Sequence, residues 1–153
     1  MPPRDVRPTS ERARQAYFNI VGDRIEGARF LDLFAGTGAF AFEAASRGAA
    51  ESIAVDSSRK HIAEIESKAK EWNAAVKGVV GDALKYRPNG AIDLVYADPP
   101  YDFERYDDLI AAIEQIDPAL AAVEHRSKTQ LTPASFIRTA EYGEVRITFF
   151  GRN

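Results

Sequence analysis

The sequence contains no cysteine, and this absence excludes disulfide bonds, thiolate metal ligands and cysteine nucleophiles together. It also lacks any apolar run that approaches the ~20 residues of a membrane-spanning helix, and no apolar stretch follows its first residues. We therefore expect a cytoplasmic protein with no signal peptide and no membrane partner. Neither histidine stands at ligand spacing from another metal-binding side chain, so we expect no metal site.

Positive charge is not in excess either. The chain carries 20 Lys and Arg against 23 Asp and Glu, a net charge of −3. Nucleic-acid binding through overall charge is thereby excluded, and such binding would need a local basic patch. The densest positive cluster comprises Arg7, Arg12 and Arg14. Arg12 and Arg14 are two residues apart on a predicted helix, so one can face phosphate while the other braces the fold; a solvated helix start is the alternative.

What the sequence does have is the composition of one globular domain. Its 153 residues are 45% apolar and 28% charged, without repeats or linkers. Helix-like and strand-like segments alternate, which is typical of an α/β fold with a parallel sheet. The predicted strands are 28–34, 52–56, 78–82, 92–96, 120–124 and a hairpin of 136–142 and 144–150. The predicted helices begin after Thr9, at 39, at 57 or 58 and at 103, and Trp72 is assigned to the core.

A glycine-rich turn follows the first predicted strand and precedes a predicted helix. Gly36 and Gly38 let the backbone approach a ligand closely, and N–H groups at a helix N-terminus point at that ligand. Asp56 lies eighteen residues beyond Gly38, where a carboxylate can accept both hydroxyls of a ribose. Together these features predict a nucleotide-cofactor site, although the glycines alone could form only a tight turn. No Lys follows them, which excludes a phosphate-binding P-loop.

The most specific motif is Asp98-Pro99-Pro100-Tyr101, at the end of the fourth predicted strand. The two prolines remove two backbone donors and stiffen the turn. The remaining carboxylate, carbonyl groups and aromatic face can accept hydrogen bonds from an –NH₂ group and stack on a flat ring. A rigid turn with a Tyr in the core is the structural alternative. Asp82, after the third predicted strand, can likewise meet an adenine edge or simply cap a turn.

Three blocks of the sequence resemble one family. The blocks Arg7–Arg14, Leu31–Gly38 and Asp98–Tyr101 are similar to those of the RsmD-like family of bacterial 16S rRNA guanine-N2 methyltransferases, which are class I S-adenosylmethionine-dependent enzymes. The resemblance implies a Rossmann-like fold in one domain, residues 1–153, with a mostly parallel seven-stranded sheet, a C-terminal β-hairpin and helices on both faces. It implies S-adenosylmethionine as cofactor and ribosomal RNA as partner, within a small-subunit assembly particle.

The resemblance also assigns roles to residues of this sequence. The Asp98 carboxylate and the Pro99 carbonyl would accept the N–H groups of the guanine amine, and Tyr101 would stack on a base turned out of its helix. The catalytic residues implied are Asp98, Pro99, Pro100 and Tyr101. The cofactor-binding residues implied are Asp32, Phe34, Ala35, Gly36, Thr37, Gly38, Asp56, Ser57, Asp82 and Ala83. The RNA-binding residues implied are Arg7, Thr9, Arg12 and Arg14.

Three departures from the family pattern keep other functions open. Only six residues precede Arg7, where family members usually have a basic β-hairpin; Gln15 replaces a usual Glu; and residues 124–134 lack a clear helix pattern. In the family this hairpin belongs to the surface that docks on RNA, so its absence from the pattern bears on which substrate the protein uses. Alternative methyl acceptors are the amines of DNA adenine or cytosine and a protein glutamine amide. Alternatives of another class are an NAD-dependent oxidoreductase, because the glycine turn with Asp56 also fits a dinucleotide fold, and a non-catalytic RNA-binding module.

Overall fold

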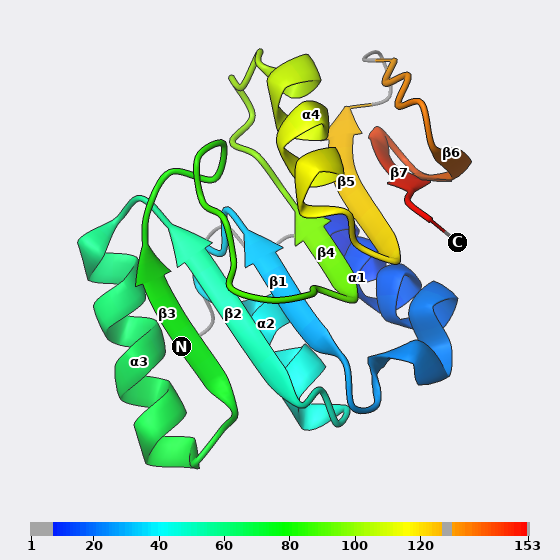
Figure 1. Ribbon diagram of the computed structural model, residues 1–153. Helices are drawn as coiled ribbons and strands as arrows, with labels where there is room; N and C mark the ends of the chain where they lie inside the picture. Colours follow the sequence, from blue (N-terminus) through cyan, green and yellow to red (C-terminus); the bar gives the residue numbers. More distant parts are fainter. Residues whose placement is uncertain (1–7, 127–129, 153) are drawn as a thin grey trace.

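The computed structural model describes residues 8–126 and 130–152 (Figure 1). The helices in these residues are α1 (Pro8–Val21), α2 (Ala39–Ser46), α3 (Arg59–Trp72) and α4 (Tyr106–Ile116), with a short 3₁₀ helix, Gly22–Ile25, after α1. The strands are β1 (Arg29–Leu33), β2 (Glu51–Asp56), β3 (Val76–Val80), β4 (Leu94–Ala97), β5 (Leu120–Arg126), β6 (Phe136–Tyr142) and β7 (Val145–Phe150).

One sheet contains all of these strands, in the order β3-β2-β1-β4-β5-β7-β6. The strands from β3 to β5 in this order are parallel, and Leu33 of β1 is level with Val55 of β2 and Ala97 of β4. Strand β7 is antiparallel to both of its neighbours, β5 and β6. The predicted mostly parallel, seven-stranded sheet with a C-terminal hairpin is therefore confirmed.

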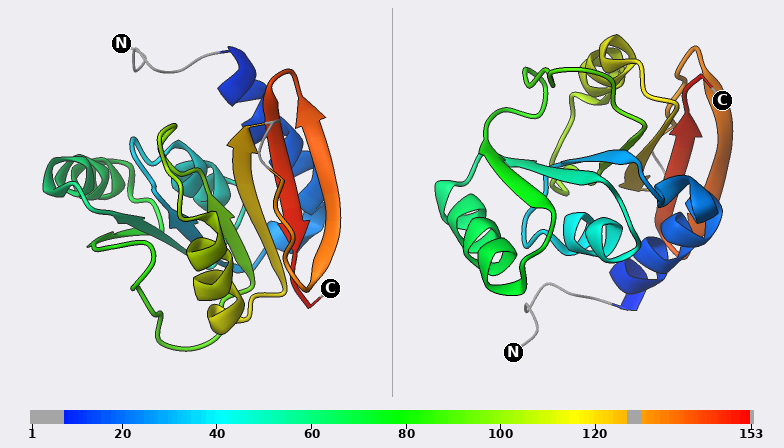
Figure 2. Two further views of the ribbon diagram at one scale, coloured as in Figure 1. Left: turned by 90° about the horizontal axis from the view of Figure 1, so that it is seen from above. Right: turned by 60° about the horizontal axis from the view of Figure 1, so that its bottom comes forward.

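The central strands are covered by helices on both faces. Alternate residues of a strand point to opposite faces, and Phe30 and Tyr96 pack in one core cluster with residues of α1 and α2. Leu31 and Val95 belong to a second cluster that includes residues of α4. Figure 2 shows α1 and α2 on one side of the sheet and α4 on the other. The near-continuous apolar runs of the central strands follow from this double coverage.

Several element boundaries differ from the predicted ones. Helix α1 begins at Pro8, one residue before the predicted cap Thr9, and a proline suits the first helical position because it has no N–H to satisfy. Strand β3 ends at Val80 rather than at residue 82, because the Asp82 side chain accepts a hydrogen bond from the Leu84 N–H and turns the chain. Helix α4 begins at Tyr106, three residues later than predicted.

The assignment of Trp72 to the core is wrong. Its side chain is 57% exposed, although Ile62, Ile65 and Ala69 of the same helical stripe are buried. Trp72 is the last residue of α3, and its ring packs edge-on against Phe42 of α2, with 5.0 Å between the ring centroids. The stripe predicts the buried face of α3 correctly, but its last residue lies at the rim of that face.

Candidate active site

The candidate site lies at the carboxyl ends of β1 and β4. The chain leaves β1 toward β2 on one side and leaves β4 toward β5 on the other. Ligands of open α/β sheets bind where the strand order reverses in this way. Leu33 and Ala97 are paired in register, so the glycine turn after β1 and the Asp98 turn after β4 begin side by side.

The glycine turn has the backbone conformation that its sequence requires. Gly36 and Gly38 have φ values of 57° and 85°, in the left-handed region that glycine tolerates best. The Gly38 N–H donates to the Ala35 carbonyl at 2.8 Å, and α2 follows without a side-chain cap. A Cβ at Gly38 would lie 3.0 Å from Cγ1 of Ile65, whereas a Cβ at Gly36 would meet nothing within 4 Å. Gly38 therefore packs against α3, and Gly36 faces open space beside the uncapped start of α2.

Asp56 holds the glycine turn in place from the end of β2. Its Oδ2 accepts a hydrogen bond from the Gly36 N–H at 2.7 Å, and its Oδ1 accepts one from the Ser58 N–H at 2.8 Å. The Nδ1 atom of His61 lies 3.4 Å from the same Oδ1. A carboxylate has about four acceptor positions; the two backbone N–H groups take two and the His61 ring lies at a third, so Asp56 keeps capacity for at least one ribose hydroxyl.

Asp32 is a buried carboxyl group on the face of β1 that α1 and α2 cover. Its Oδ2 atom has no hydrogen-bond partner among the described residues. Burial raises the pKa of this carboxyl well above its usual value, the charges of Asp98 and Asp56 raise the pKa further, and a hydrogen bond from the backbone of Ala41 lowers it. A cation bound beside Oδ2 would favour the ionised carboxylate.

Phe34 is the strained residue of the turn. Its φ of 63° is unusual for an aromatic side chain, and such strain is found preferentially at ligand-binding sites. The ring packs edge-on against Phe103, with 5.4 Å between the centroids. Phe34 thus links the glycine turn after β1 to the loop after β4.

These features fit S-adenosylmethionine, the cofactor that the resemblance implies. Its methionine part is cationic at the amino group and the sulfonium, and the buried Oδ2 of Asp32, which has no partner among the described residues, is an acceptor for positive charge. The open space at Gly36 admits a ligand close to the backbone, and Asp56 has acceptor capacity left for a ribose. The part of the chain that the structure describes thus supplies groups suited to each end of the cofactor except the adenine.

The remaining predicted cofactor residues have mainly structural contacts. Asp82 caps a turn: its Oδ1 accepts from the Leu84 N–H at 2.9 Å, and its carbonyl accepts from the N–H groups of Lys85 and Tyr86. Ala83 is buried, whereas Thr37 and Ser57 are exposed. Of the two serines predicted as caps of α3, Ser58 is the cap, since its side chain accepts from the His61 N–H. A role of Asp82 and Ala83 toward adenine stays a prediction.

The turn after β4 presents the predicted polar and aromatic groups. Asp98 and Pro100 are exposed, and Pro99 is buried. The Pro100 carbonyl accepts a hydrogen bond from the Phe103 N–H at 2.9 Å, which closes a turn around Tyr101. The Tyr101 side chain is 81% exposed, so the alternative of a core tyrosine is wrong. No hydrogen bond to the Pro99 carbonyl occurs within residues 8–126 and 130–152.

Sequence reasoning missed the polar pair behind this turn. The Tyr96 hydroxyl of β4 donates a hydrogen bond to the Glu124 carboxylate of β5. Burial raises the pKa of Tyr96 far above its usual value, and the charges of Glu124, Asp98 and Asp32 add to the effect. The Tyr96 ring also stacks on Phe40 in the first turn of α2, with 3.7 Å between the centroids. The sequence did contain a signal for this pair: Glu124 is a carboxylate that directly follows the apolar run of a buried strand.

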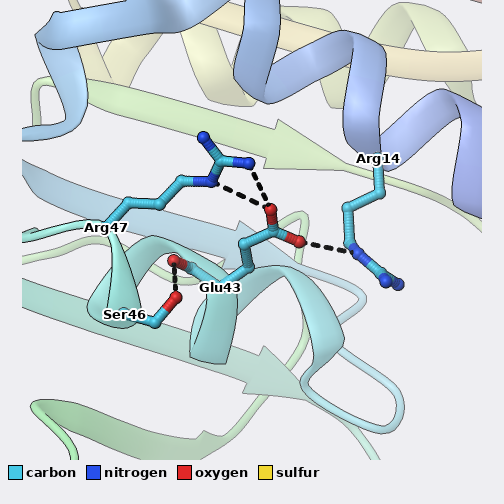
Figure 3. A network of polar contacts seen from close by, with 4 residues as sticks. All are labelled: Arg14, Glu43, Ser46 and Arg47. Atoms are coloured by element: carbon cyan, nitrogen blue, oxygen red, sulfur yellow. Dashed lines mark hydrogen bonds and ion pairs between the residues drawn. The ribbon is translucent and has the colours of Figure 1, made fainter.

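The predicted RNA-binding arginines behave differently from one another. Arg14 of α1 forms an ion pair with Glu43 of α2, with 2.8 Å between Nε and Oε1 (Figure 3). The same carboxylate is bound by Arg47, whose guanidinium lies over the Phe18 ring. Arg14 therefore braces two helices, and Arg12 is exposed. Arg7 lies outside the described residues, and of Thr9 only the helical backbone is described.

Neither a metal site nor a membrane span is found in the described ranges. No group of three or more His, Asp or Glu side chains there is arranged to hold a metal ion. No helix there combines the length and the apolar character that crossing a bilayer requires.

Comparison with known proteins identifies the family. The profile of the family described as "Conserved hypothetical protein 95" matches residues 1–151. "Putative rRNA methyltransferase YlbH" of Bacillus subtilis is 30% identical over 122 residues, which are 72% of this chain and 64% of that protein. "Ribosomal RNA small subunit methyltransferase D" of Escherichia coli K12 is 31% identical over 99 residues, which are 63% of this chain and 50% of that protein. The chain thus spans about half to two-thirds of the length of these relatives.

A solved structure agrees over nearly the whole chain. "Putative methyltransferase yhhF from Escherichia coli" superposes with a TM-score of 0.86 at 28% identity, covering 99% of this chain and 90% of that one. This similarity confirms the expected Rossmann-like methyltransferase fold, and the family match confirms the resemblance found in the sequence blocks.

Proposed function

Since the chain belongs to the conserved hypothetical protein 95 family, we propose that it transfers the methyl group of S-adenosylmethionine to the exocyclic N2 amine of a guanine in small-subunit ribosomal RNA. The observation that carries the proposal is the Asp98-Pro99-Pro100-Tyr101 turn, with Asp98 and Tyr101 exposed, beside the glycine turn and the buried Asp32, whose Oδ2 has no partner among the described residues. The turn supplies acceptors for an amine and a ring for a base, and its neighbours supply acceptors for a cationic cofactor.

On the cofactor side, the chain would bind and orient S-adenosylmethionine. The N–H groups around Gly36 and the first turn of α2 would approach the cofactor, Asp56 would accept the ribose hydroxyls, and Asp32 would face the positive methionine part. Asp82 and Ala83 would lie near the adenine. The cofactor supplies a methyl group already activated by the sulfonium, so the protein mainly has to position a nucleophile, which is worth ~7–11 kcal/mol.

On the substrate side, the chain would prepare a weak nucleophile. The lone pair of a guanine amine is delocalised into the ring, and acceptors on both of its N–H groups favour a pyramidal, more nucleophilic nitrogen. The Asp98 carboxylate and the Pro99 carbonyl are the two acceptors, and Tyr101 stacks on the base. The amine nitrogen, held by Asp98 and Pro99, would accept the methyl group that the bound cofactor supplies, and the electron pair of the carbon–sulfur bond would stay with sulfur. The surplus proton of the amine then leaves to Asp98 or to water.

The choice of ribosomal RNA is supported by the names of the relatives and by the exposed Arg12 of α1. Relatives are named rRNA methyltransferases, one of them for the small subunit. Those names specify neither the methylated atom nor the form of the RNA. We propose the guanine N2 amine as the methylated group and an assembly particle as the substrate. One sheet runs from Arg29 to Phe150, which supports residues 1–153 acting as a single catalytic domain, and we expect it to act in the cytoplasm.

Methyl transfer to isolated ribosomal material tests the proposal. Small subunits and naked 16S RNA from a strain lacking the enzyme would be incubated with labelled cofactor, and their nucleosides analysed by mass spectrometry. We expect N2-methylguanosine, with the particle as the better substrate. Labelling of DNA or protein with neither RNA accepted would refute the RNA assignment. Binding of NADH but not S-adenosylhomocysteine in calorimetry would refute the methyltransferase assignment.

A matched pair of variants tests the role of Asp98. Asp98→Asn should lower the rate of methyl transfer about 100- to 1,000-fold, the usual effect of removing one transition-state hydrogen-bonding group, while S-adenosylhomocysteine still binds. Asp102→Asn changes the same charge in the same exposed turn and should leave the rate unchanged. Near wild-type turnover by Asp98→Asn would show that Asp98 does not polarise the amine.

A further inference from the structure

Arg126 lies over the exposed aromatic ring of the catalytic turn. It is the last residue of β5, and β5 pairs in parallel with β4 up to Ala97 and Val123. Arg126 therefore lies beyond the end of β4, level with the Asp98–Tyr101 turn. Its guanidinium carbon is 5.0 Å from the centroid of the Tyr101 ring, within the range of a cation–π contact.

The chain that begins at the Asp98 turn is acidic. The stretch from Asp98 to Asp108 contains five acidic residues and one basic residue, Arg105, and Arg105 is paired with Asp108 at 2.9 Å. Burial raises the pKa of Tyr106 in α4, the charge of Asp98 raises it further, and the charge of Arg126 lowers it. Arg126 thus lies near enough to Asp98 for both charges to act on one phenol.

The acidic stretch from Asp98 to Asp108 would repel a polyanionic substrate. A nucleotide whose base enters beside Asp98 brings its phosphate groups close to the same carboxylates, and this repulsion must be offset by a nearby cation. Arg126 has no ion-pair partner within the described parts of the chain. A guanidinium stacked on a ring still presents N–H donors at its edge, and their geometry matches a phosphate bidentately.

We propose that Arg126 binds a phosphate group of the target nucleotide while its guanidinium rests on one face of Tyr101. The proposal rests on the proposed function, because it takes a base of a polynucleotide as the substrate. Tyr101 would then serve two partners: Arg126 on one face of its ring and the base on the other. Arg126 contributes to substrate affinity, and Asp98 contributes to the chemical step.

The test compares Arg126→Gln and Arg126→Lys with a control, Arg138→Gln. Arg138 is exposed on β6 and level with Phe149, whereas Arg126 is level with Val145 at the other end of β7. Each protein would methylate small subunits from a strain lacking the enzyme, over a range of salt concentrations. Single-turnover rates at saturating subunits and S-adenosylhomocysteine affinity would be measured alongside, the latter as a check that the variants fold.

Arg126→Gln should raise KM about tenfold, the loss of one charge-assisted hydrogen bond, and leave the single-turnover rate and the S-adenosylhomocysteine affinity unchanged. The dependence of log KM on log salt should become shallower by about 0.7–0.9. Arg126→Lys should keep the wild-type salt dependence, because its charge remains, but recover KM only in part, because a lysine cannot bind bidentately. Arg138→Gln should match the wild type.

Two results would overturn the inference while the wild type methylates the subunits. One is an unchanged KM and salt dependence in Arg126→Gln. The other is a lower single-turnover rate with an unchanged KM, which would assign Arg126 to the electrostatics of Asp98 instead. A wild-type protein that methylates no RNA, although it binds S-adenosylhomocysteine, would overturn the proposed function and the Arg126 proposal with it, and this outcome is visible before any variant is made.

Discussion

Replacing Arg14 by Gln should lower the stability of the protein and leave its affinity for RNA nearly unchanged. The Nε atom of Arg14 is 2.8 Å from Glu43, and the two side chains are 28% and 24% exposed. This half-buried pair joins α1 to α2 (Figure 3), and α2 begins at the glycine turn. The change therefore removes a contact between two helices on the same face of the sheet.

The size of the effect depends on the ion pair with Arg47 that Glu43 retains in the variant. Arg47 remains bound to the other carboxylate oxygen through Nε at 2.9 Å and Nη2 at 2.8 Å. Glu43 is thus not left as an unpaired buried charge, and the ~3–5 kcal/mol cost of such a charge does not apply. Fully exposed ion pairs contribute about 0.2–1 kcal/mol. For this less exposed pair we expect a loss of about 1 kcal/mol, which lowers Tm by about 2–4 °C in a domain of this size.

Urea denaturation of a double-mutant cycle measures this contribution. The cycle uses Arg14→Gln, Glu43→Gln and the double variant, so that the coupling free energy is separated from the loss of each side chain. Arg12→Gln is the matched control, because Arg12 is exposed on the same helix. We expect it to keep wild-type stability and to make the salt dependence of RNA binding shallower.

The opposite pattern would refute this reasoning. It would consist of no coupling between Arg14 and Glu43 in the cycle, an unchanged Tm for Arg14→Gln, and a weaker affinity for small subunits. Arg14 would then be a phosphate-binding residue whose contact with Glu43 carries no free energy of folding.

Two buried polar groups provide further predictions. Tyr17→Phe should raise the free energy of unfolding by about 1 kcal/mol in urea denaturation, because the buried Tyr17 hydroxyl has no partner among the described residues; a loss of stability would show that this hydroxyl is bonded in solution. The pKa of Asp32 is raised on folding, so between the unfolded value of 3.8 and the folded value this group makes the protein less stable as the pH rises. Asp32→Asn should therefore be more stable than the wild type at pH 7.5, with a smaller advantage in acid, and should bind S-adenosylmethionine more weakly in calorimetry. A stability difference that does not change with pH would contradict the assigned titration.

The sheet and the positions of the motifs could be predicted because they depend on local patterns. Buried parallel strands are short apolar runs, and the glycine turn and the Asp98 turn each follow such a run directly. Once the sheet is parallel, the carboxyl ends of its strands lie at one edge, so Gly36, Asp56 and Asp98 are expected at the same edge, and the strand order β2-β1-β4 makes them neighbours. Exact boundaries depend on single hydrogen bonds, such as the one from Leu84 to Asp82 that ends β3 early.

Contacts between residues far apart in the chain could not be predicted. The partners of Arg14 and Tyr96 are 29 and 28 residues away, and no periodicity within either segment indicates them. Trp72 shows the same limit, because its place in a helical stripe is a local property but its 57% exposure depends on where α3 ends relative to α2. The contact between Arg126 and Tyr101 likewise requires the register of β4 and β5.

Under the function that we propose, the charge distribution of the site favours an RNA that is already folded as the substrate. Asp32 and Asp56 suit a cationic cofactor. Burial, and then the charges of Asp98 and Asp56, raise the pKa of Asp32. The same negative charges oppose a polyanion. With a net charge of −3 and Arg14 engaged by Glu43, the chain has no excess of positive charge with which to bind a flexible strand. Recognition through a few contacts succeeds when the partner is already held in the bound shape, because the partner then loses little conformational entropy on binding. An RNA segment folded within a ribosomal particle meets this condition, and a naked strand does not.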